Sequence, residues 1–383
     1  MPLSYTIVTF SHLRWNFVYQ RPQHLLSRLA ASHRVFFVEE PEFDSAGPAR
    51  WERSQPRPNL TVLRPRTPVE APGFDAAQVA ALTPLIQELR AELEPDAVVA
   101  WLYTPMALPL ARELEPVAMV YDCMDELSLF LGAPPDLLSR EQELLTSADV
   151  MFTGGPSLFR AKQSRHDNVH CFPSSVNAAH FSAARPDRHD RVPEAEDQAS
   201  LPHPRLGFYG VIDERLDLPL LEEVASARPD WQIVLVGPVV KIDPATLPQR
   251  PNMHYFGQRT YEQLPGYLAG WDVCLLPFAR NPSTRFISPT KTLEYMAAEL
   301  PVVSTPITDV AEPYGDIVYL GSTPAEFVAA CDAALTSSPE ERDRRAARMR
   351  QVLSGTSWEV TVAAMEELVR EAVMKNSDVQ VSA

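Results

Sequence analysis

The stretch that decides the fold of this chain is residues 206–236, LGFYGVIDERLDLPLLEEVASARPDWQIVLV. It begins with an apolar run, Leu206–Tyr209, continues with a helical pattern over Leu218–Ala227 and ends with a second run, Gln232–Val236. Buried runs of strand length that alternate with helices are typical of βαβ units and of a mainly parallel sheet. The stretch therefore predicts an α/β fold.

The same alternation extends along the chain in both directions. Further strands are predicted at Tyr5–Phe10, Val35–Glu39, Leu60–Leu63, Ala97–Tyr103, Val117–Asp122, Val150–Thr153, Val169–Phe172, Met253–Tyr255, Val273–Leu276, Val302–Ser304 and Ile317–Leu320. Further helices are predicted at Pro22–Ala31, Ala76–Leu93, Asp136–Ser147, Pro156–Arg165, Tyr261–Leu268, Pro289–Glu299, Pro324–Thr336, Pro339–Leu353 and Trp358–Met374.

Residues 182–204 interrupt this pattern, because they lack apolar periodicity and are rich in proline. We interpret them as a linker between an N-terminal domain (1–181) and a C-terminal domain (205–356). We expect the helix at 357–375 to cross back to the first domain, followed by a tail at 376–383. Each domain is expected to be a doubly wound, Rossmann-like parallel sheet, and the two are expected to face a central cleft.

Composition narrows the class of partner. The 383 residues carry 34 basic and 50 acidic side chains, a net charge of −16, which argues against general nucleic-acid binding. No uninterrupted apolar window approaches the 18 residues of a membrane span. The four cysteines form no Cys-x-x-Cys pair, and we interpret them as reduced. The expected location is the cytoplasm, and weak contact with the inner face of the membrane stays open.

Residues 288–294, SPTKTLE, carry the most informative chemistry. Ser288 suits a helix N-cap and Pro289 the first helical position, so free N–H groups there would bind phosphate. Lys291 adds a charge in the same turn, and Glu294 lies on the same side at i,i+3 spacing. Glu294 could accept the hydroxyls of a ribose. The alternative is a capped surface helix with a Lys–Glu pair.

The run SPTKTLEYMAAELPVVST at 288–305 resembles the nucleotide-sugar domain of GT-B glycosyltransferases (glycosyl transferases group 1-like). FYGVIDERLD, LVGP and YFGQRTYEQLPGYLAGWDVCLLPF resemble the same domain. The retaining, bacterial cell-surface-polysaccharide branch is the most similar, and YQRPQHLLSRLA and VYDCMDE in the first half resemble it too. The resemblance covers about residues 4–375. It implies transfer of a sugar from a nucleoside-diphosphate sugar, such as a UDP-sugar, to a glycan, lipid-linked or small-molecule acceptor. It implies no cofactor and no metal.

The resemblance also implies site residues. Glu294 matches the second glutamate of a Glu-x7-Glu motif that holds the donor ribose. The first glutamate falls at Phe286, which has no carboxylate, so backbone groups of Ile287–Thr290 would take its place. Lys291 and Arg215 would lie at the diphosphate; the alternative for Arg215 is an ion pair with Asp213 or Glu214. The full donor-binding set is Gly210, Gly237, Phe256, Gly257, Ser288, Pro289, Thr290 and Glu294.

The first domain would hold the acceptor. Residues 1–38 contain four arginines, three histidines and no carboxylate, a local charge of +4 that would attract an anion. Asp122, at the end of a predicted strand, is expected to act in catalysis with Arg215 and Lys291. For Trp15, the alternative to binding the acceptor is a place in a buried aromatic cluster. The acceptor-binding set is Arg14, Trp15, Arg21, His24 and Asp125.

Three other functions stay open at this point. A sugar-nucleotide epimerase has the same architecture and would need no acceptor. The missing carboxylate at Phe286 leaves a non-catalytic nucleotide-sugar-binding protein as a second alternative. A dinucleotide-dependent dehydrogenase is disfavoured, because no Gly-x-Gly-x-x-Gly follows the first strand of either half.

Overall fold

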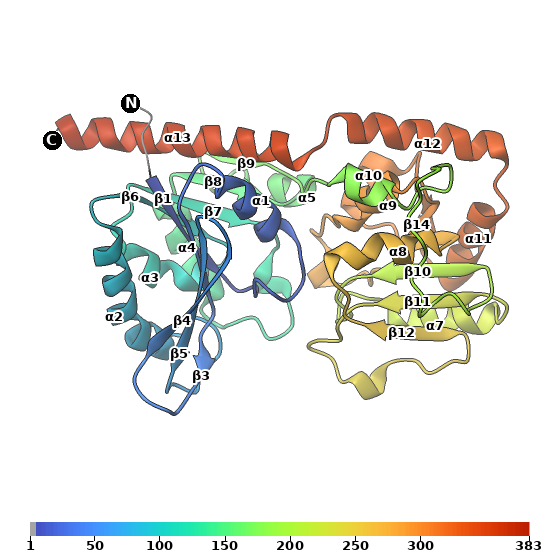
Figure 1. Cartoon of the computed structure of the whole chain (residues 1–383), viewed down its shortest axis with the longest axis horizontal. Helices are drawn as coiled ribbons and strands as arrows, with labels where there is room; N and C mark the ends of the chain where they lie inside the picture. Colours follow the sequence, from blue (N-terminus) through green and yellow to red (C-terminus); the bar gives the residue numbers. More distant parts are fainter. Residues whose placement is uncertain (1–4, 383) are drawn as a thin grey trace. The chain divides into compact units, whose positions relative to one another are not determined.

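The computed structural model describes residues 5–382, and the side chains of residues 5–378. Contacts divide the chain into two compact units. The first contains the chain up to Ser128, Gly132–Pro173 and the residues from Glu359 onward, and the second contains Leu129–Leu131 and Ser174–Trp358. Each unit is built around its own sheet (Figure 1).

The first unit has a nine-stranded sheet in the order β3-β5-β2-β1-β6-β7-β8-β9, with β4 paired to β5. Its pairs are parallel except β4–β5, and Ile7 of β1 lies opposite Val35 of β2 and Val99 of β6. The strands are β1 (Tyr5–Ser11), β2 (Val35–Glu39), β3 (Glu42–Phe43), β4 (Arg50–Arg57), β5 (Leu60–Thr67), β6 (Ala97–Leu102), β7 (Ala118–Cys123), β8 (Val150–Thr153) and β9 (Val169–Cys171). The helices are α1 (Arg21–Leu29), α2 (Ala76–Leu93), η1 (Pro105–Ala107), α3 (Leu108–Arg112), η2 (Leu127–Leu129), α4 (Leu137–Ser147), α5 (Pro156–Lys162) and α13 (Trp358–Ser382).

The second unit has six parallel strands in the order β12-β11-β10-β13-β14-β15. They are β10 (Arg205–Tyr209), β11 (Gln232–Val236), β12 (Met253–Gly257), β13 (Val273–Leu276), β14 (Val302–Ser304) and β15 (Tyr319–Leu320). The helices are α6 (Ala178–Ser182), α7 (Leu218–Ala227), η3 (Pro244–Thr246), η4 (Tyr261–Gln263), α8 (Leu264–Ala269), η5 (Pro282–Thr284), α9 (Lys291–Ala297), α10 (Thr308–Tyr314), α11 (Pro324–Leu335) and α12 (Pro339–Ser354).

The two parallel sheets confirm the predicted α/β class, and α2 and α7 have the predicted bounds. The sequence did not reveal β3 and β4. The β4 sequence RWERSQPR has no apolar alternation, and most of its residues are exposed. Cross-strand ion pairs accompany this hairpin: Glu52 of β4 receives the Arg66 guanidinium of β5 at 2.6 Å. Such non-local pairs leave no local pattern.

The order of the second sheet reverses between β10 and β13. The chain runs from β10 to β11 on one side and from β13 to β14 on the other, so the strand ends separate there. Crevices at the carboxyl ends of strands on either side of such a reversal are where doubly wound sheets bind ligands. The candidate site of the second unit is therefore at the ends of β10 and β13.

The expected linker, residues 182–204, is part of the second unit. Gln198 is buried and its amide nitrogen donates to the Tyr267 carbonyl oxygen at 2.9 Å, while its amide oxygen accepts from the Trp271 indole at 3.0 Å. Arg205 donates to the carbonyl oxygen of Ala199 at 3.1 Å. Polar side chains thus attach this segment without the apolar periodicity that sequence patterns detect.

The residues of α13 after Trp358 pack on the first unit, along which the helix runs in Figure 1. Glu359 pairs with Arg28 at 2.8 Å, and Glu366 lies 2.8 Å from the His33 ring. The Asn376 amide donates to Asp149 at 2.8 Å. This helix extends beyond its predicted end. Among the helices of residues 5–382, none is both long enough and apolar enough to cross a membrane.

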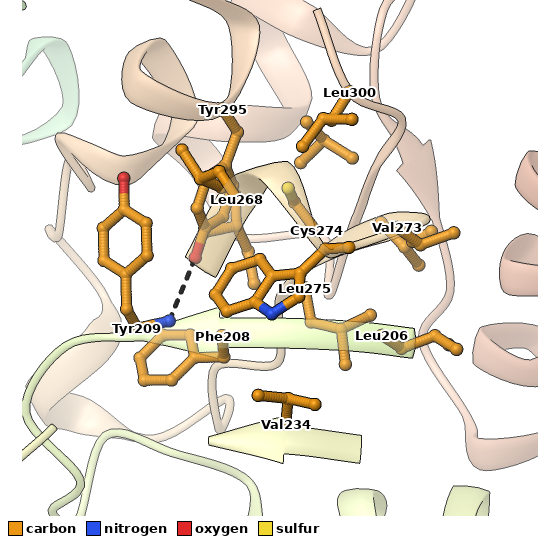
Figure 2. Packing of buried hydrophobic residues seen from close by; sticks show 14 of the residues in the cluster. Leu206, Phe208, Tyr209, Val234, Leu268, Val273, Cys274, Leu275, Tyr295 and Leu300 are labelled. Atoms are coloured by element: carbon orange, nitrogen blue, oxygen red, sulfur yellow. Dashed lines mark hydrogen bonds between the residues drawn. The ribbon is translucent and has the colours of Figure 1, made fainter. Parts of the chain in front are cut away.

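The core of the second unit surrounds β10. Leu206 and Phe208 lie among Val234 of β11 and Val273 and Leu275 of β13 (Figure 2). Between Leu206 and Phe208, Gly207 has no side chain because the buried Trp271 ring occupies that space: a Cβ on Gly207 would overlap with three ring carbons. An indole packed directly on the strand backbone therefore requires glycine at this position.

Gly207→Ala is expected to lower the free energy of unfolding by about 1–3 kcal/mol, because the methyl group would force the Trp271 ring to move. Chemical denaturation followed by circular dichroism measures this change. Gly355→Ala is the matched control, since a Cβ there meets nothing within 4 Å. Equal stability of the two variants would contradict this account of the core.

Candidate functional site

Three predicted donor-site glycines line the carboxyl edge of the second sheet. Gly210 and Gly237 directly follow β10 and β11, Gly257 ends β12, and their φ angles are +141°, +150° and +67°. The Gly210 N–H donates to the Val236 carbonyl oxygen and the Gly237 N–H to that of Gly257, both at 2.8 Å. A Cβ on Gly237 would overlap with the Gly210 carbonyl. Only glycine fits there, and the edge presents bare backbone.

Lys291 lies across this edge. Its Cε and Nζ occupy the space that a Cβ on Gly210 would need, and Nζ is 5.7 Å from the centre of the Phe208 ring. Gly210 directly follows β10 and Lys291 begins α9, which follows β13, so the lysine reaches across the point where the strand order reverses. This brings a cationic amine to bare backbone, an arrangement that suits a phosphate.

Glu294, on α9, is the buried carboxylate of the site, with 7% of its surface exposed. The Tyr209 hydroxyl donates to its Oε2 at 2.7 Å, and Oε1 accepts no hydrogen bond from the described residues. The Tyr295 hydroxyl in turn accepts from the Tyr209 N–H at 3.3 Å (Figure 2). Burial raises the pKa of Glu294, while the Tyr209 hydrogen bond and the charge of Lys291 act to lower it. One carboxylate oxygen is thus held in place, and the other has no hydrogen-bond partner among the described residues.

The predicted start of this helix is wrong. The helix begins at Lys291 and its N-cap is Thr290, which makes no side-chain cap hydrogen bond. The Pro289 carbonyl accepts from the Thr292 N–H at 3.1 Å, so one tighter turn precedes the helix and displaces Ser288 and Pro289 from the cap. The helix has seven residues, and the charge at this end comes from Lys291 rather than from a long row of peptide dipoles.

Arg215 forms an ion pair with Asp213, which was the alternative to binding the diphosphate. Its Nε and Nη2 donate to the Asp213 carboxylate at 3.0 and 2.7 Å, and its Cζ is 5.4 Å from the centre of the Phe130 ring. Phe256 packs its ring 5.8 Å from that of Tyr267, at the end of β12. Phe286 stands where the Glu-x7-Glu motif has its first glutamate. The centre of its ring is 5.0 Å from Arg285 Cζ.

The expected basic surface of the first unit is wrong. Each arginine of residues 1–38 pairs with a carboxylate that lies later in the chain: Arg14 with Glu39, Arg21 with Asp122, Arg28 with Glu359 and Arg34 with Asp96. The local charge of +4 was counted without these partners, which only the fold supplies. The segment is therefore neutralised in the folded chain.

Arg21 and Asp122 form the buried pair of this unit, with 1% and 0% of their side chains exposed. Arg21 Nη2 lies 2.9 Å from Asp122 Oδ1, and Nη1 donates to the Phe172 carbonyl oxygen at 2.6 Å. Burial acts to lower the pKa of Arg21, but the charge and the hydrogen bond of Asp122, with smaller contributions from Tyr103 and Cys171, together hold this pKa above its ordinary value. Asp122, predicted to be catalytic, thus has a full countercharge in the interior.

The other predicted acceptor residues are mostly anchored or buried. Trp15 is 7% exposed and packs edge-on to Phe37 at 5.2 Å, the buried cluster that was the alternative. The backbone N–H of Trp15 donates to the Glu39 carboxylate at 2.7 Å, and Glu39 also pairs with Arg14 at 3.3 Å. His24 is buried with its ring 4.6 Å from that of Tyr19. Asp125 is half-buried on the loop after β7.

The expectation that the protein needs no metal stays a prediction. Within residues 5–378 no three His, Cys, Asp or Glu side chains are grouped to hold a metal ion. Cys123, Cys274 and Cys331 are free and buried, and Cys171 is partly buried.

Comparisons with known proteins agree with this geometry. Residues 203–337 match the family model described as Glycosyl transferases group 1. TuaH of Bacillus subtilis (strain 168), a glycosyltransferase assigned to teichuronic acid biosynthesis, is 26% identical over 283 residues, which are 68% of this chain and 69% of TuaH. Residues 203–337 thus form a Glycosyl transferases group 1 domain, and the chain is a glycosyltransferase.

Solved structures show the same fold for this glycosyltransferase at low identity. An Escherichia coli structure described as trehalose-6-phosphate bound with UDP-2-fluoro glucose has a TM-score of 0.69 at 14% identity, covering 95% of this chain and 99% of that one. Sucrose-phosphate synthase from Thermosynechococcus elongatus has a TM-score of 0.68 at 15% identity, covering 96% and 99%. The resemblance seen in the sequence is confirmed, and the epimerase and non-catalytic alternatives are not favoured.

Tyr209, which holds Glu294, was not among the candidate site residues predicted from the sequence. Its hydroxyl stands at the end of a buried strand, directly before Gly210, and a polar tip there needs a partner. The sequence FYG at residues 208–210 contains this signal, a tyrosine at the end of a predicted strand. The partner, Glu294, is 85 residues away and follows only from the fold.

Glu294→Gln is expected to stabilise the glycosyltransferase at neutral pH. The pKa of Glu294 is raised in the folded state above its ordinary 4.5, so the folded chain binds this proton more tightly than the unfolded chain. The ionised carboxylate therefore costs stability above that pKa, and the cost disappears below pH 4.5. Melting temperatures at pH 7 and pH 4 measure it. A variant that is less stable than wild type at pH 7 would contradict this assignment.

Asp122→Asn is expected to destabilise the chain by about 3–5 kcal/mol, because it leaves the buried Arg21 charge unpaired. Asp96→Asn is the matched control: its pair with Arg34 is exposed, and such pairs contribute about 0–1 kcal/mol. Denaturant unfolding compares the two. If Asp122→Asn were as stable as the control and only turnover fell, Asp122 would act in the chemistry instead.

Proposed function

We propose that this glycosyltransferase takes its sugar from a nucleoside-diphosphate sugar bound by the second unit. The observation that carries the proposal is the grouping of Lys291, the bare glycine edge and the Oε1 of Glu294 at one strand-order reversal. The glycines let a diphosphate approach the backbone, and Lys291 offers it a countercharge. Glu294 Oε1 can accept a ribose hydroxyl, as acidic residues do in other doubly wound sheets.

The reaction we propose is transfer with retention of the anomeric configuration. The bond between the anomeric carbon and the diphosphate oxygen breaks, and a bond from the acceptor hydroxyl oxygen to the same carbon forms. The hydroxyl proton passes to an oxygen of the departing diphosphate. Lys291 stabilises the charge that develops on that diphosphate, which is the electrostatic contribution of this chain. No side-chain nucleophile is required.

The acceptor we propose is a glycan of the cell envelope. The similarity to TuaH, whose description assigns it to teichuronic acid biosynthesis, supports a polysaccharide rather than a small molecule. The trehalose- and sucrose-phosphate neighbours share only the fold at 14–15% identity, so their acceptors are not carried over. Membrane contact loses its main support, because the basic segment that suggested it is neutralised.

Calorimetric titration with UDP, GDP, ADP and dTDP tests the donor site. Wild type is expected to bind one of them selectively, and Glu294→Ala to bind it about tenfold or more weakly, since a hydrogen bond to a charged group contributes about 1.5–3 kcal/mol. Glu340→Ala, an exposed glutamate on α12, is the matched control. Binding unchanged in Glu294→Ala would remove Glu294 from the site.

The same preparation separates transfer from epimerisation. Retaining transfer requires an acceptor, and nuclear magnetic resonance of the product gives the anomeric configuration directly. Conversion of a sugar nucleotide in the absence of any acceptor would favour the epimerase instead.

A further inference from the structure

Lys241 is a cation of the second unit that the sequence patterns did not single out. It lies four residues beyond Gly237, at the same carboxyl edge of the sheet. Its φ is +62°, in the left-handed region that side chains other than glycine and asparagine rarely adopt. Residues held in this conformation are found preferentially at functional sites.

The backbone brings Lys241 beside Arg215. Beyond the glycines, the chains that follow β10 and β11 continue side by side: Ile212 and Val239 form a parallel bridge. The Ile212 N–H donates to the Pro238 carbonyl oxygen at 2.9 Å, and the Val240 N–H to that of Ile212 at 3.1 Å. The sheet edge is thereby extended from the glycines toward the turn that carries Arg215.

One aromatic ring lies against both cations. The centre of the Phe130 ring is 5.1 Å from Lys241 Nζ and 5.4 Å from Arg215 Cζ. Phe130 belongs to the short segment Leu129–Leu131 of the second unit, and the Leu131 N–H donates to Glu214 Oε1 at 3.3 Å. Two like charges are thus held next to one ring, which stabilises cations through its negative face.

The partners of the two cations differ. Arg215 makes a two-pronged pair with Asp213, and the other carboxylate of this turn, Glu214, accepts from a backbone N–H. The exposed Lys241 amine makes no hydrogen bond or ion pair with any residue whose side chain is described. An ammonium has three donors, and here they stand beside a guanidinium at a phosphate-suited edge.

We propose that Lys241, together with Arg215, binds an anionic group of the sugar donor. The inference rests on the proposed function and extends it, because it adds a second cationic position to that of Lys291. The chemistry recognised is an oxyanion. Its source is either the diphosphate of the donor or a carboxylate on a donor sugar of the uronic acid class, and Phe130 is the ring that both cations contact.

Calorimetric titration of Lys241→Met tests this proposal. The probes are the nucleoside diphosphate that wild type prefers, its glucose conjugate and its glucuronate conjugate. We expect affinity to fall about tenfold for at least one, the range of a charge-assisted hydrogen bond. An equal loss for all three identifies the diphosphate, and a loss confined to the glucuronate conjugate identifies a sugar carboxylate. Affinities within twofold of wild type for all three would overturn the proposal.

Three further variants separate binding from folding. Lys241→Gly removes the amine and also relieves the left-handed backbone, so it is expected to bind as weakly as Lys241→Met while melting no lower than wild type. Lys241→Arg is expected to restore most of the affinity. Lys375→Met, an exposed lysine of α13, removes the same charge elsewhere and should bind like wild type. Weak binding by Lys375→Met would show that net charge, and not this position, matters.

Pyrophosphate distinguishes failure of this inference from failure of the proposed function. If wild type binds no nucleotide but binds pyrophosphate in a Lys241-dependent way, the anion position stands and the nucleotide-sugar donor is wrong. If nucleotide binding is strong and independent of Lys241, the donor stands and this inference is wrong. If wild type binds neither probe, both are wrong.

Discussion

A buried carboxylate without a cationic ion-pair partner is the constraint on which the second unit depends. Glu294 is kept in the interior by one neutral hydrogen bond from Tyr209, and burial raises the pKa of Glu294. Such a group costs folding free energy unless something binds it. The strand order places β13 beside β10, and α9 follows β13, so the Tyr209 hydrogen bond joins α9 to the end of β10. The same helix brings Lys291 to Gly210.

Asp122 and Glu294 are buried carboxylates with opposite surroundings. In the first unit, Asp122 has a guanidinium at 2.9 Å and is complete without a ligand. Arg21 also reaches the Phe172 carbonyl and lies 3.9 Å from the Met365 sulfur of α13, so this pair joins β7, the segment after β9 and the C-terminal helix. In the second unit, one oxygen of Glu294 accepts no hydrogen bond from residues 5–378. A satisfied pair specifies structure, whereas an unsatisfied carboxylate is suited to binding.

The sequence predicted what local patterns encode. Apolar runs and helical periodicity predicted the two sheets, and Gly210, Gly237, Lys291 and Glu294 were named from local motifs and from the family that those motifs resemble. Contacts between distant residues were beyond its reach. The partner of Arg21 is 101 residues away, and without it a buried arginine was interpreted as part of an exposed basic surface. The start of α9 was misplaced because a tighter turn at Pro289 satisfies the same local preferences as a helix cap.

The use of arginine and lysine in this chain follows the same division between structure and binding. Thirty arginines and four lysines make up its 34 basic residues. Guanidinium groups match carboxylates with two parallel hydrogen bonds, and arginines here pair widely with the 50 acidic side chains, as Arg53 does with Glu92. Lysine is a compact charge that pairs less rigidly. Lys162 is enclosed between Glu126 and Glu141, but Lys241 and Lys291 both stand at the carboxyl edge of the second sheet. A chain with a net charge of −16 repels an anionic donor at long range. Cations held beside bare backbone offset this repulsion close to the sheet edge.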